Sequence, residues 1–322
     1  MQQCWQYING KLVTGKGKLR TVINPATEEV VAEYQGADAS QAEEALCAAQ
    51  KAFPYWSELS LGEREKYISA LADAFQKEKD RIVSLLIEET GKPLETALYD
   101  FQMLLDCLHF FMEEAKRIYG EIISDYDDTH RNYIFHKPIG VVVGYLAWNF
   151  PLLNVGYKLG PILASGCTCV LKPSSLTPLA TLLLGEIAEK IGFPPGVINI
   201  LCGDSAEVAK TMNQSGIPRM ITLIGSSQTG KEIVAQSSNR VRHYSLELGG
   251  NAPVIVLKDA SVSEVARRTV CQKFDNCGQV CVAPNRVFVH ESQIDEFLQA
   301  AQNEAEKIVL TYQQGDGLKW VR

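Results

Sequence analysis

The run Val-Val-Val-Gly-Tyr-Leu-Ala, residues 141–147, decides the fold that we expect for this chain. It is apolar along its length, which is typical of a strand buried on both faces. Similar runs recur downstream, with helical segments between them. Strands are expected at 168–171, 197–201, 220–224, 244–247 and 253–257, and helices at 178–190, 205–212 and 229–236. This alternation predicts an α/β fold with a doubly wound, Rossmann-like parallel sheet.

The segment before this sheet predicts a hairpin followed by four helices. Asn9-Gly10 is a strong turn pair between apolar residues. A serine followed three residues later by a glutamate, the capping-box pattern, opens the first two helices at Ser40 and Ser60. Apolar residues at steps of three and four mark the fourth helix, which Gly120 ends. The helices are expected at 40–53, 60–77, 80–90 and 98–118.

Residues 121–137 differ from both neighbouring regions. The stretch 124–128 is polar, and 132–136 alternates like an exposed strand. A strand with apolar residues and no obvious partner often pairs across a subunit interface. We therefore expect an oligomerisation arm here.

Composition excludes several classes of function. The net charge is −7 and no basic block occurs, which argues against a nucleic-acid surface. No apolar run approaches the roughly 20 residues that cross a bilayer, and the first residues lack the layout of a signal peptide. The 9 cysteines are odd in number and scattered, which favours reduced thiols in the cytoplasm. Their spacing to the histidines predicts no metal site.

Polar or glycine-bearing turns follow four of the expected strands. They are Trp148–Pro151, Lys172–Ser175, Gly225–Gly230 and Glu247–Gly250. The carboxyl ends of parallel strands lie at one edge of a sheet, where such folds bind their ligands. The four turns together therefore predict a ligand site.

The glycine-bearing turn comes close to a P-loop, because Gly225 and Gly230 precede a lysine. Glu232 stands where that loop needs a hydroxyl for magnesium, so we reject nucleotide hydrolysis. The glycines still allow close backbone approach, and the helix after them can hold a diphosphate at its N-terminus.

The polar residues of the other turns each have a second explanation. Lys172 offers a charge to ribose or phosphate oxygens, or is a solvated surface lysine. Asn149 contacts a ligand, or only caps its turn. Glu247 lies between Leu246 and Leu248, which suggests burial; burial would raise its pKa toward that of a general base.

Cys281 follows Gly278-Gln279-Val280 and precedes a strand-like run at 286–290. A cysteine on a short turn can face a cleft and act as a nucleophile. The alternative is a buried cysteine that acts as a small hydrophobic residue, which is the more common case for a free thiol. The turn alone does not decide between them.

The five motifs together resemble the NAD(P)-dependent aldehyde dehydrogenase family. They are Trp148-Asn149-Phe150-Pro151, Lys172-Pro173-Ser174, Gly225-Ser226-x-x-x-Gly230, Leu246-Glu247-Leu248-Gly249-Gly250 and Asn276-x-Gly278-Gln279-x-Cys281, in that order. The resemblance implies that Cys281 attacks the aldehyde carbonyl. It also implies that Asn149 and the backbone N–H of Cys281 stabilise the oxyanion, and that Glu247 activates water to hydrolyse the thioester.

The resemblance also implies a bound NAD or NADP. Lys172 matches the ribose-binding lysine, and the remaining cofactor contacts are expected at Trp148, Ser174, Ser175, Gly225, Ser226, Gly230 and Leu248. Ser175 replaces a glutamate that is frequent in NAD-preferring members, and a carboxylate there would repel a 2′-phosphate. We therefore expect NADP to be accepted. If the protein discriminates between the two cofactors, we expect NADP to be the preferred one.

The substrate that the resemblance suggests is a short polar aldehyde or semialdehyde. Leu153, Asn154, Tyr157, Val280 and Val282 are expected near the aldehyde, and the helix after Asn149 carries no arginine for a substrate carboxylate. The family is similar to lactaldehyde and semialdehyde oxidisers.

The resemblance further implies a division into domains and a homo-oligomer. We expect a cofactor domain at 1–120 and 138–247, a partial oligomerisation arm at 121–137, and the first part of an α/β catalytic domain at 248–322. The match predicts a C-terminally truncated member whose oligomerisation is doubtful. The alternatives to an active enzyme are a non-catalytic fragment that at most binds cofactor or a partner, and a cofactor-independent thioesterase.

Overall fold

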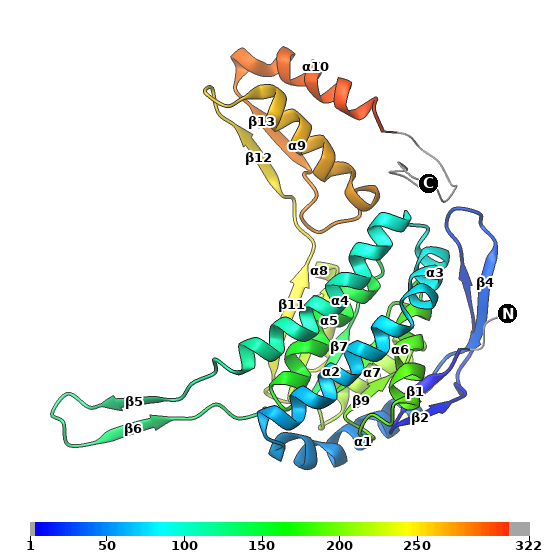
Figure 1. Cartoon of the computed structure of the whole chain (residues 1–322), viewed down its shortest axis with the longest axis vertical. Coiled ribbons are helices and arrows are strands. Elements are labelled where there is room, and N and C mark those ends of the chain that lie inside the picture. The colour runs from blue at the N-terminus through cyan, green and yellow to red at the C-terminus, as the bar shows by residue number, and fades with distance from the viewer. Residues whose placement is uncertain (1–3, 309–322) are drawn as a thin grey trace.

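The structure is a computed structural model and describes residues 4–308. A seven-stranded sheet in the order β11-β10-β7-β8-β9-β1-β2 forms its centre (Figure 1). The strands are β1 Gln6–Ile8, β2 Lys11–Val13, β7 Val141–Tyr145, β8 Thr168–Lys172, β9 Ile198–Ile200, β10 Met220–Gly225 and β11 His243–Leu248. The five strands from β7 to β11 run parallel, as predicted. The β1–β2 hairpin adds to β9 antiparallel, so the complete sheet is mixed.

Helices cover both faces of this sheet, which accounts for its continuous apolar strands. All residues of β7 and β8 are buried. Along β7, Val142 packs into one buried cluster, while Val141 and Val143 pack into another. The first cluster includes α2 Leu61–Lys77, α3 Lys79–Thr90, α4 Leu94–Ala115, α5 Pro151–Ala164 and α6 Leu179–Lys190, and the second includes α1 Ala39–Glu58 and α8 Ser227–Gln236. Alternate side chains of a strand point to opposite faces, so a doubly covered strand is apolar throughout.

The predicted caps of the first two helices had different outcomes. Ser60 and Glu63 form the predicted capping box at the start of α2. The cap of α1 was wrongly assigned: Asp38 accepts the N–H of Gln41, and the Ser40 hydroxyl donates to Asp38 instead. Aspartate caps a helix as well as serine does, so the earlier residue takes the position. The helix also continues past Phe53 to Glu58.

Three other boundaries also differ from the prediction. The fourth helix begins at Leu94 and ends at Ala115, because Arg117 and Ile118 donate to carbonyls three residues back and tighten the last turn. The predicted helix at 205–212 is a π-helical turn, Ser205–Ala209, followed by α7 Lys210–Gln214. The helix α8 begins at Ser227, two residues early, because Ser226 caps it.

The arm at 121–137 is a hairpin of two exposed strands, β5 Glu121–Ser124 and β6 Arg131–Ile134. The two strands pair antiparallel with each other, so the partner that the sequence did not reveal lies within the chain. Figure 1 shows this hairpin extending away from the main body. A second hairpin, β3 Leu19–Ile23 with β4 Val30–Gln35, was not predicted.

The residues after β11 form a smaller unit, at the top of Figure 1. The strands β12 Pro253–Val256 and β13 Arg286–Val289 pair in parallel, and α9 Val262–Phe274 and α10 Ile294–Ala305 pack on them. A 3₁₀ turn, Asp275–Gly278, follows α9, and another, Glu291–Gln293, precedes α10. The predicted division into 1–120, 121–137, 138–247 and 248–322 includes residues 1–3 and 309–322, which lie outside the described residues.

Candidate active site

A cavity of about 590 Å³ lies at the carboxyl edge of the sheet. The turns after β7, β8, β10 and β11 all contribute to its lining, and so does the loop 278–281. Because these parallel strands end at the same edge of the sheet, the four turns that the sequence singled out lie together. The lining includes ten of the eleven candidate residues: Trp148, Asn149, Lys172, Ser174, Ser175, Gly225, Ser226, Glu247, Leu248 and Cys281. Gly230 packs directly behind it, where a Cβ would lie 3.1 Å from a methyl of Leu248.

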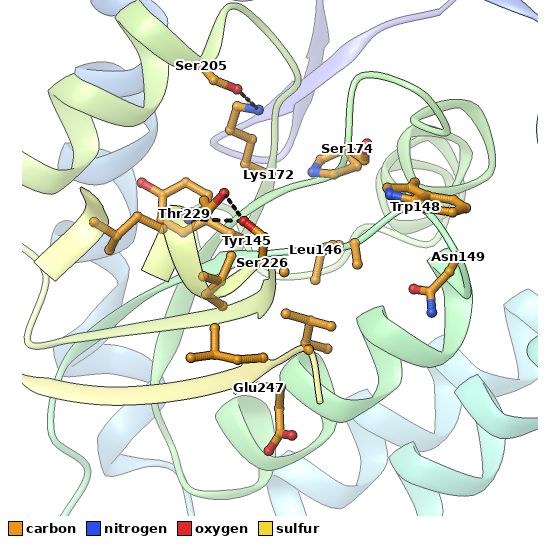
Figure 2. Close-up of a pocket in the computed structure, with 18 of the residues that line it drawn as sticks. Tyr145, Leu146, Trp148, Asn149, Lys172, Ser174, Ser205, Ser226, Thr229 and Glu247 are labelled. Carbon is orange, nitrogen blue, oxygen red and sulfur yellow. Dashed lines mark hydrogen bonds between the residues drawn. The ribbon is translucent and has the colours of Figure 1, made fainter. Parts of the chain in front are cut away.

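One end of the cavity carries groups suited to a phosphorylated ligand. Lys172 ends β8, is 5% exposed, and donates from Nζ to the hydroxyl of Ser205 at 3.2 Å. Ser226 caps α8 by accepting the N–H of Thr229 at 3.1 Å. Figure 2 shows Lys172 and Ser205 at one end of the view and Glu247 at the other. A lysine and the N-terminus of a helix together favour an anion.

Asn149 connects the strand edge to the loop that carries the cysteine. Its side-chain N–H₂ donates to the carbonyl of Gln279 at 2.8 Å, and its own main-chain carbonyl accepts from the side chain of Asn276 at 3.0 Å. An amide nitrogen carries two protons, so one N–H of Asn149 remains for another acceptor. The side-chain oxygen is buried and has no partner within residues 4–308.

Cys281 lies in the loop after the 3₁₀ turn and is an exposed, free thiol. Two residues of that turn, Asn276 and Cys277, have φ of 44° and 61°, which is the left-handed region that side chains rarely adopt. The loop before Cys281 is therefore strained, and its hydrogen bonds to Asn149 hold it in place. The prediction of a cysteine on an accessible turn is confirmed.

Glu247 also lines the cavity, but its predicted burial is wrong. Its side chain is exposed, although its neighbours Leu246 and Leu248 are half-buried. Alternation explains the difference, since successive side chains of β11 point to opposite faces of the sheet. The described residues therefore leave the Glu247 carboxylate in contact with water.

The comparison with protein families matches residues 12–319 to the aldehyde dehydrogenase family. The chain belongs to the aldehyde dehydrogenase family. It is 38% identical over 299 residues to a 3,6-anhydro-alpha-L-galactose dehydrogenase of Vibrio sp. (strain EJY3), covering 92% of this chain and 62% of that protein. It is also 38% identical over 313 residues to a mitochondrial succinate-semialdehyde dehydrogenase of Arabidopsis thaliana, covering 97% of this chain and 58% of that protein.

Solved aldehyde dehydrogenase structures share the fold. The structure of 3,6-anhydro-L-galactose dehydrogenase in complex with NAP superposes with a TM-score of 0.94 at 34% identity, covering 99% of this chain and 67% of that chain. The betaine aldehyde dehydrogenase of Staphylococcus aureus in complex with NAD⁺ gives 0.92 at 32% identity, covering 98% and 63%. The chain thus spans about three fifths of the curated relatives that it matches.

Three charged residues near the main cavity were missed by the sequence analysis, Lys158 and the pair of Lys92 with Asp100. Lys158, on α5, lines a second cavity of about 390 Å³ with Tyr157. Burial lowers the pKa of Lys158 to about 8, and the negative charge of Glu247 partly opposes that shift. The signal in the sequence was the single charged residue of a mostly apolar helix.

The second missed group is a buried ion pair between Lys92 and Asp100, with Nζ and Oδ2 2.9 Å apart. Lys92 also donates to the main-chain carbonyl of Asn149. The sequence offered no sign of this contact, because Lys92 follows an expected helix end and reads as a surface residue.

Residues 4–308 lack two kinds of feature. In that range, no three His, Cys, Asp or Glu side chains gather closely enough to hold a metal ion. Nor is any helix there long and apolar enough to cross a membrane.

Proposed function

We propose that this chain provides the catalytic groups of an aldehyde dehydrogenase, which converts an aldehyde to its carboxylic acid with NAD(P)⁺. The observation that carries the proposal is the common cavity of Asn149, Glu247 and Cys281, with Lys172 and the capped start of α8 at its other end. These groups come from five separate parts of the chain. A nucleophile, an amide donor and a carboxylate around one cavity are the groups that acyl chemistry needs.

Cys281 is proposed to add to the carbonyl carbon as a thiolate, which forms a C–S bond and an oxyanion. The N–H of Asn149 that Gln279 leaves unused, and the backbone N–H of Cys281, would hold that oxygen. The bound cofactor would accept a hydride from the same carbon, which leaves a thioester on Cys281. Glu247 would then take a proton from water as its oxygen attacks, and the C–S bond breaks to release the acid and the thiolate.

The cofactor site of the proposal fits a dinucleotide. Lys172 would contact ribose oxygens, and the N-terminus of α8 would face the diphosphate. Ser175 lines the cavity near Lys172 and carries no charge to repel a 2′-phosphate. We therefore propose that NADP is used, and preferred over NAD. A preference for NAD of more than about a hundredfold, or ~2.7 kcal/mol, would contradict this.

The substrate is proposed to be a short polar aldehyde. Tyr157 is half exposed. Burial raises its pKa most, and smaller contributions from Cys107, Tyr99, Cys281 and Glu247 act in the same direction, which supports a role for its ring beside the aldehyde. Among the described residues that line the main cavity, the one cation is Lys172, at the cofactor end. A substrate carboxylate near Cys281 would therefore find no cation within this lining. We expect neutral hydroxyaldehydes to react better than succinate semialdehyde.

The proposal includes the domain division and a homo-oligomer. Residues 1–120 and 138–247 would form the cofactor domain, 248–322 the start of the catalytic domain, and 121–137 the arm. The arm exposes Ile122, Tyr133 and Phe135 at 66%, 58% and 74%. Apolar side chains this exposed support pairing with a second copy.

We also propose a cytoplasmic location, which free thiols at Cys47 and Cys271 support.

The exposure of Glu247 favours a second candidate, a chain that binds cofactor without turnover. The two are separated by NADPH formation with glycolaldehyde and by NADP binding followed through tryptophan fluorescence. We expect aldehyde-dependent NADPH formation that is lost in Cys281→Ser, while NADP binding persists in that variant. Binding without any NADPH formation by the unmodified chain would select the second candidate.

A further inference from the structure

A charged pair is buried beneath the turn that carries Asn149. Lys92, after α3, and Asp100, on α4, have side chains 3% and 0% exposed, with 2.9 Å between Nζ and Oδ2. Taking two charges out of water costs several kcal/mol, and a well-packed apolar pair of similar size is often as stable. Stability alone therefore does not account for ions at this position.

Both members of the pair bind the turn between β7 and α5. Lys92 donates to the carbonyl of Asn149 at 2.9 Å, and its Nζ lies 4.3 Å from the ring centroid of Phe150. Asp100 accepts the N–H of Leu153 through its other oxygen at 2.7 Å. The pair therefore holds both the start of the turn and the first turn of the helix after it.

The same turn is bound to the cysteine loop. The carbonyl of Asn149 that accepts from Lys92 also accepts from the side chain of Asn276, and the amide of Asn149 donates to Gln279. Asn276 is 7% exposed and has the left-handed φ described above. A displaced Asn149 carbonyl would thus lose two donors and would move the loop that ends in Cys281.

We propose that Lys92, supported by Asp100, is a positioning residue that fixes the main chain of Asn149 and, through Asn276, the alignment of the oxyanion donor with the thiol of Cys281. The inference rests on the proposed function, since it assumes that Asn149 serves a carbonyl attacked by Cys281. Lys92 itself touches neither substrate nor cofactor in this role.

Two reactions of Cys281 separate alignment from simple loss of structure. Acylation by 4-nitrophenyl acetate passes through an oxyanion and needs Asn149, whereas alkylation by iodoacetamide forms no oxyanion. Both proceed without cofactor. Fragmentation of the peptide 274–286 in the mass spectrometer separates Cys281 from Cys277 in the same peptide, and Cys47 and Cys271 lie in other peptides. A displacement on the order of 1 Å lowers such a rate by about a hundredfold.

The test variant is Lys92→Met, which keeps the length of the side chain and removes the ammonium. We expect the acylation rate of Cys281 to fall about 10- to 100-fold, while the alkylation rate stays within about twofold. Lys92→Met/Asp100→Asn removes the uncompensated charge and is expected to restore thermal stability, but not acylation. Lys116→Met, on an exposed pair far from the turn, is the matched control and should change neither rate.

A double-mutant cycle with Asn149→Ala decides whether Lys92 acts through Asn149. We expect Lys92→Met to lower acylation little or not at all in the Asn149→Ala background. An equal loss in both backgrounds, or acylation and alkylation falling together in the charge-relieved double variant, would overturn the inference. Absence of NADPH formation by the unmodified chain would count against the proposed function alone, because the two thiol reactions need no cofactor. If 4-nitrophenyl acetate never acylates Cys281 in the chain without substitutions, although iodoacetamide alkylates it, the inference would be overturned as well.

Discussion

Replacing Lys158 with methionine should stabilise the protein at neutral pH, and the gain should fade as the pH rises. Burial lowers the pKa of Lys158 to about 8 from the ordinary lysine value of 10.5. At pH 7 the amine is charged in both folded and unfolded states, so the folded state bears the whole cost of burying that charge. The difference between the pKa values of 10.5 and about 8 corresponds to about 3 kcal/mol of folding free energy, since one pKa unit is worth about 1.4 kcal/mol.

The sign of the pH dependence follows from proton binding. Between pH 8 and 10.5 the unfolded chain binds more protons at this lysine than the folded chain, so the stability of the unmodified protein rises with pH. The rise from pH 7 to pH 9.5 is about 2 kcal/mol for this group. Methionine cannot titrate, so the advantage of Lys158→Met should shrink by the same amount.

The assay is urea unfolding of both proteins at pH 7 and pH 9.5. Other groups that titrate in this range cancel in the difference between the two proteins. Lys51→Met, at an exposed position on α1, is the matched control and should give a difference independent of pH. A Lys158→Met difference that stays constant between the two pH values would refute the reasoning, because it would show that the amine is not charged at a cost in the folded state.

Three further outcomes are expected. Ser226→Ala removes the cap of α8 and should lower the free energy of unfolding by about 1 kcal/mol in urea titrations, and should weaken NADP binding by fluorescence. Ser175→Glu should lower kcat/KM with NADP at least about tenfold while sparing NAD, because a carboxylate repels the 2′-phosphate; equal losses with both cofactors would count against the role of Ser175. Tyr133→Asp/Phe135→Asp should shift the protein to a smaller species in sedimentation, without changing its circular dichroism, if the arm pairs with a second copy.

The parallel sheet and its functional edge could be predicted because both follow from local pattern. Strands such as 141–147 and 168–171 are apolar throughout. Ligands of a parallel sheet bind at the carboxyl ends of its strands, so the position of the turns after them follows without any knowledge of side-chain contacts. Four of the five motifs behind the family assignment are those turns, and the comparison with protein families confirmed the assignment. The roles of the individual residues stay predictions.

What the sequence did not reveal depends on contacts between distant segments. The hydrogen bond from Lys92 to the carbonyl of Asn149 joins residues 57 positions apart, and no local signal in the sequence marks it. The exposure of Glu247 depends on what covers that face of β11, which its neighbours Leu246 and Leu248 do not decide. The choice between Asp38 and Ser40 as a cap was a competition between two good caps, and side-chain preference alone does not settle such a case.

The antiparallel pairing of β1 with β9 has a consequence for how the chain folds. Tyr7 lies opposite Ile200, the N–H of Asn9 binds the side chain of Asn199 across 190 residues, and Gln6 accepts the N–H of Cys202. Strand β1 therefore lacks its β9 partner until residues up to Ile200 have been made. Contacts across so long a loop form late, because closing the loop costs entropy before any contact offsets it. The β1–β2 hairpin should thus gain amide-exchange protection late during refolding, although it is synthesised before β9.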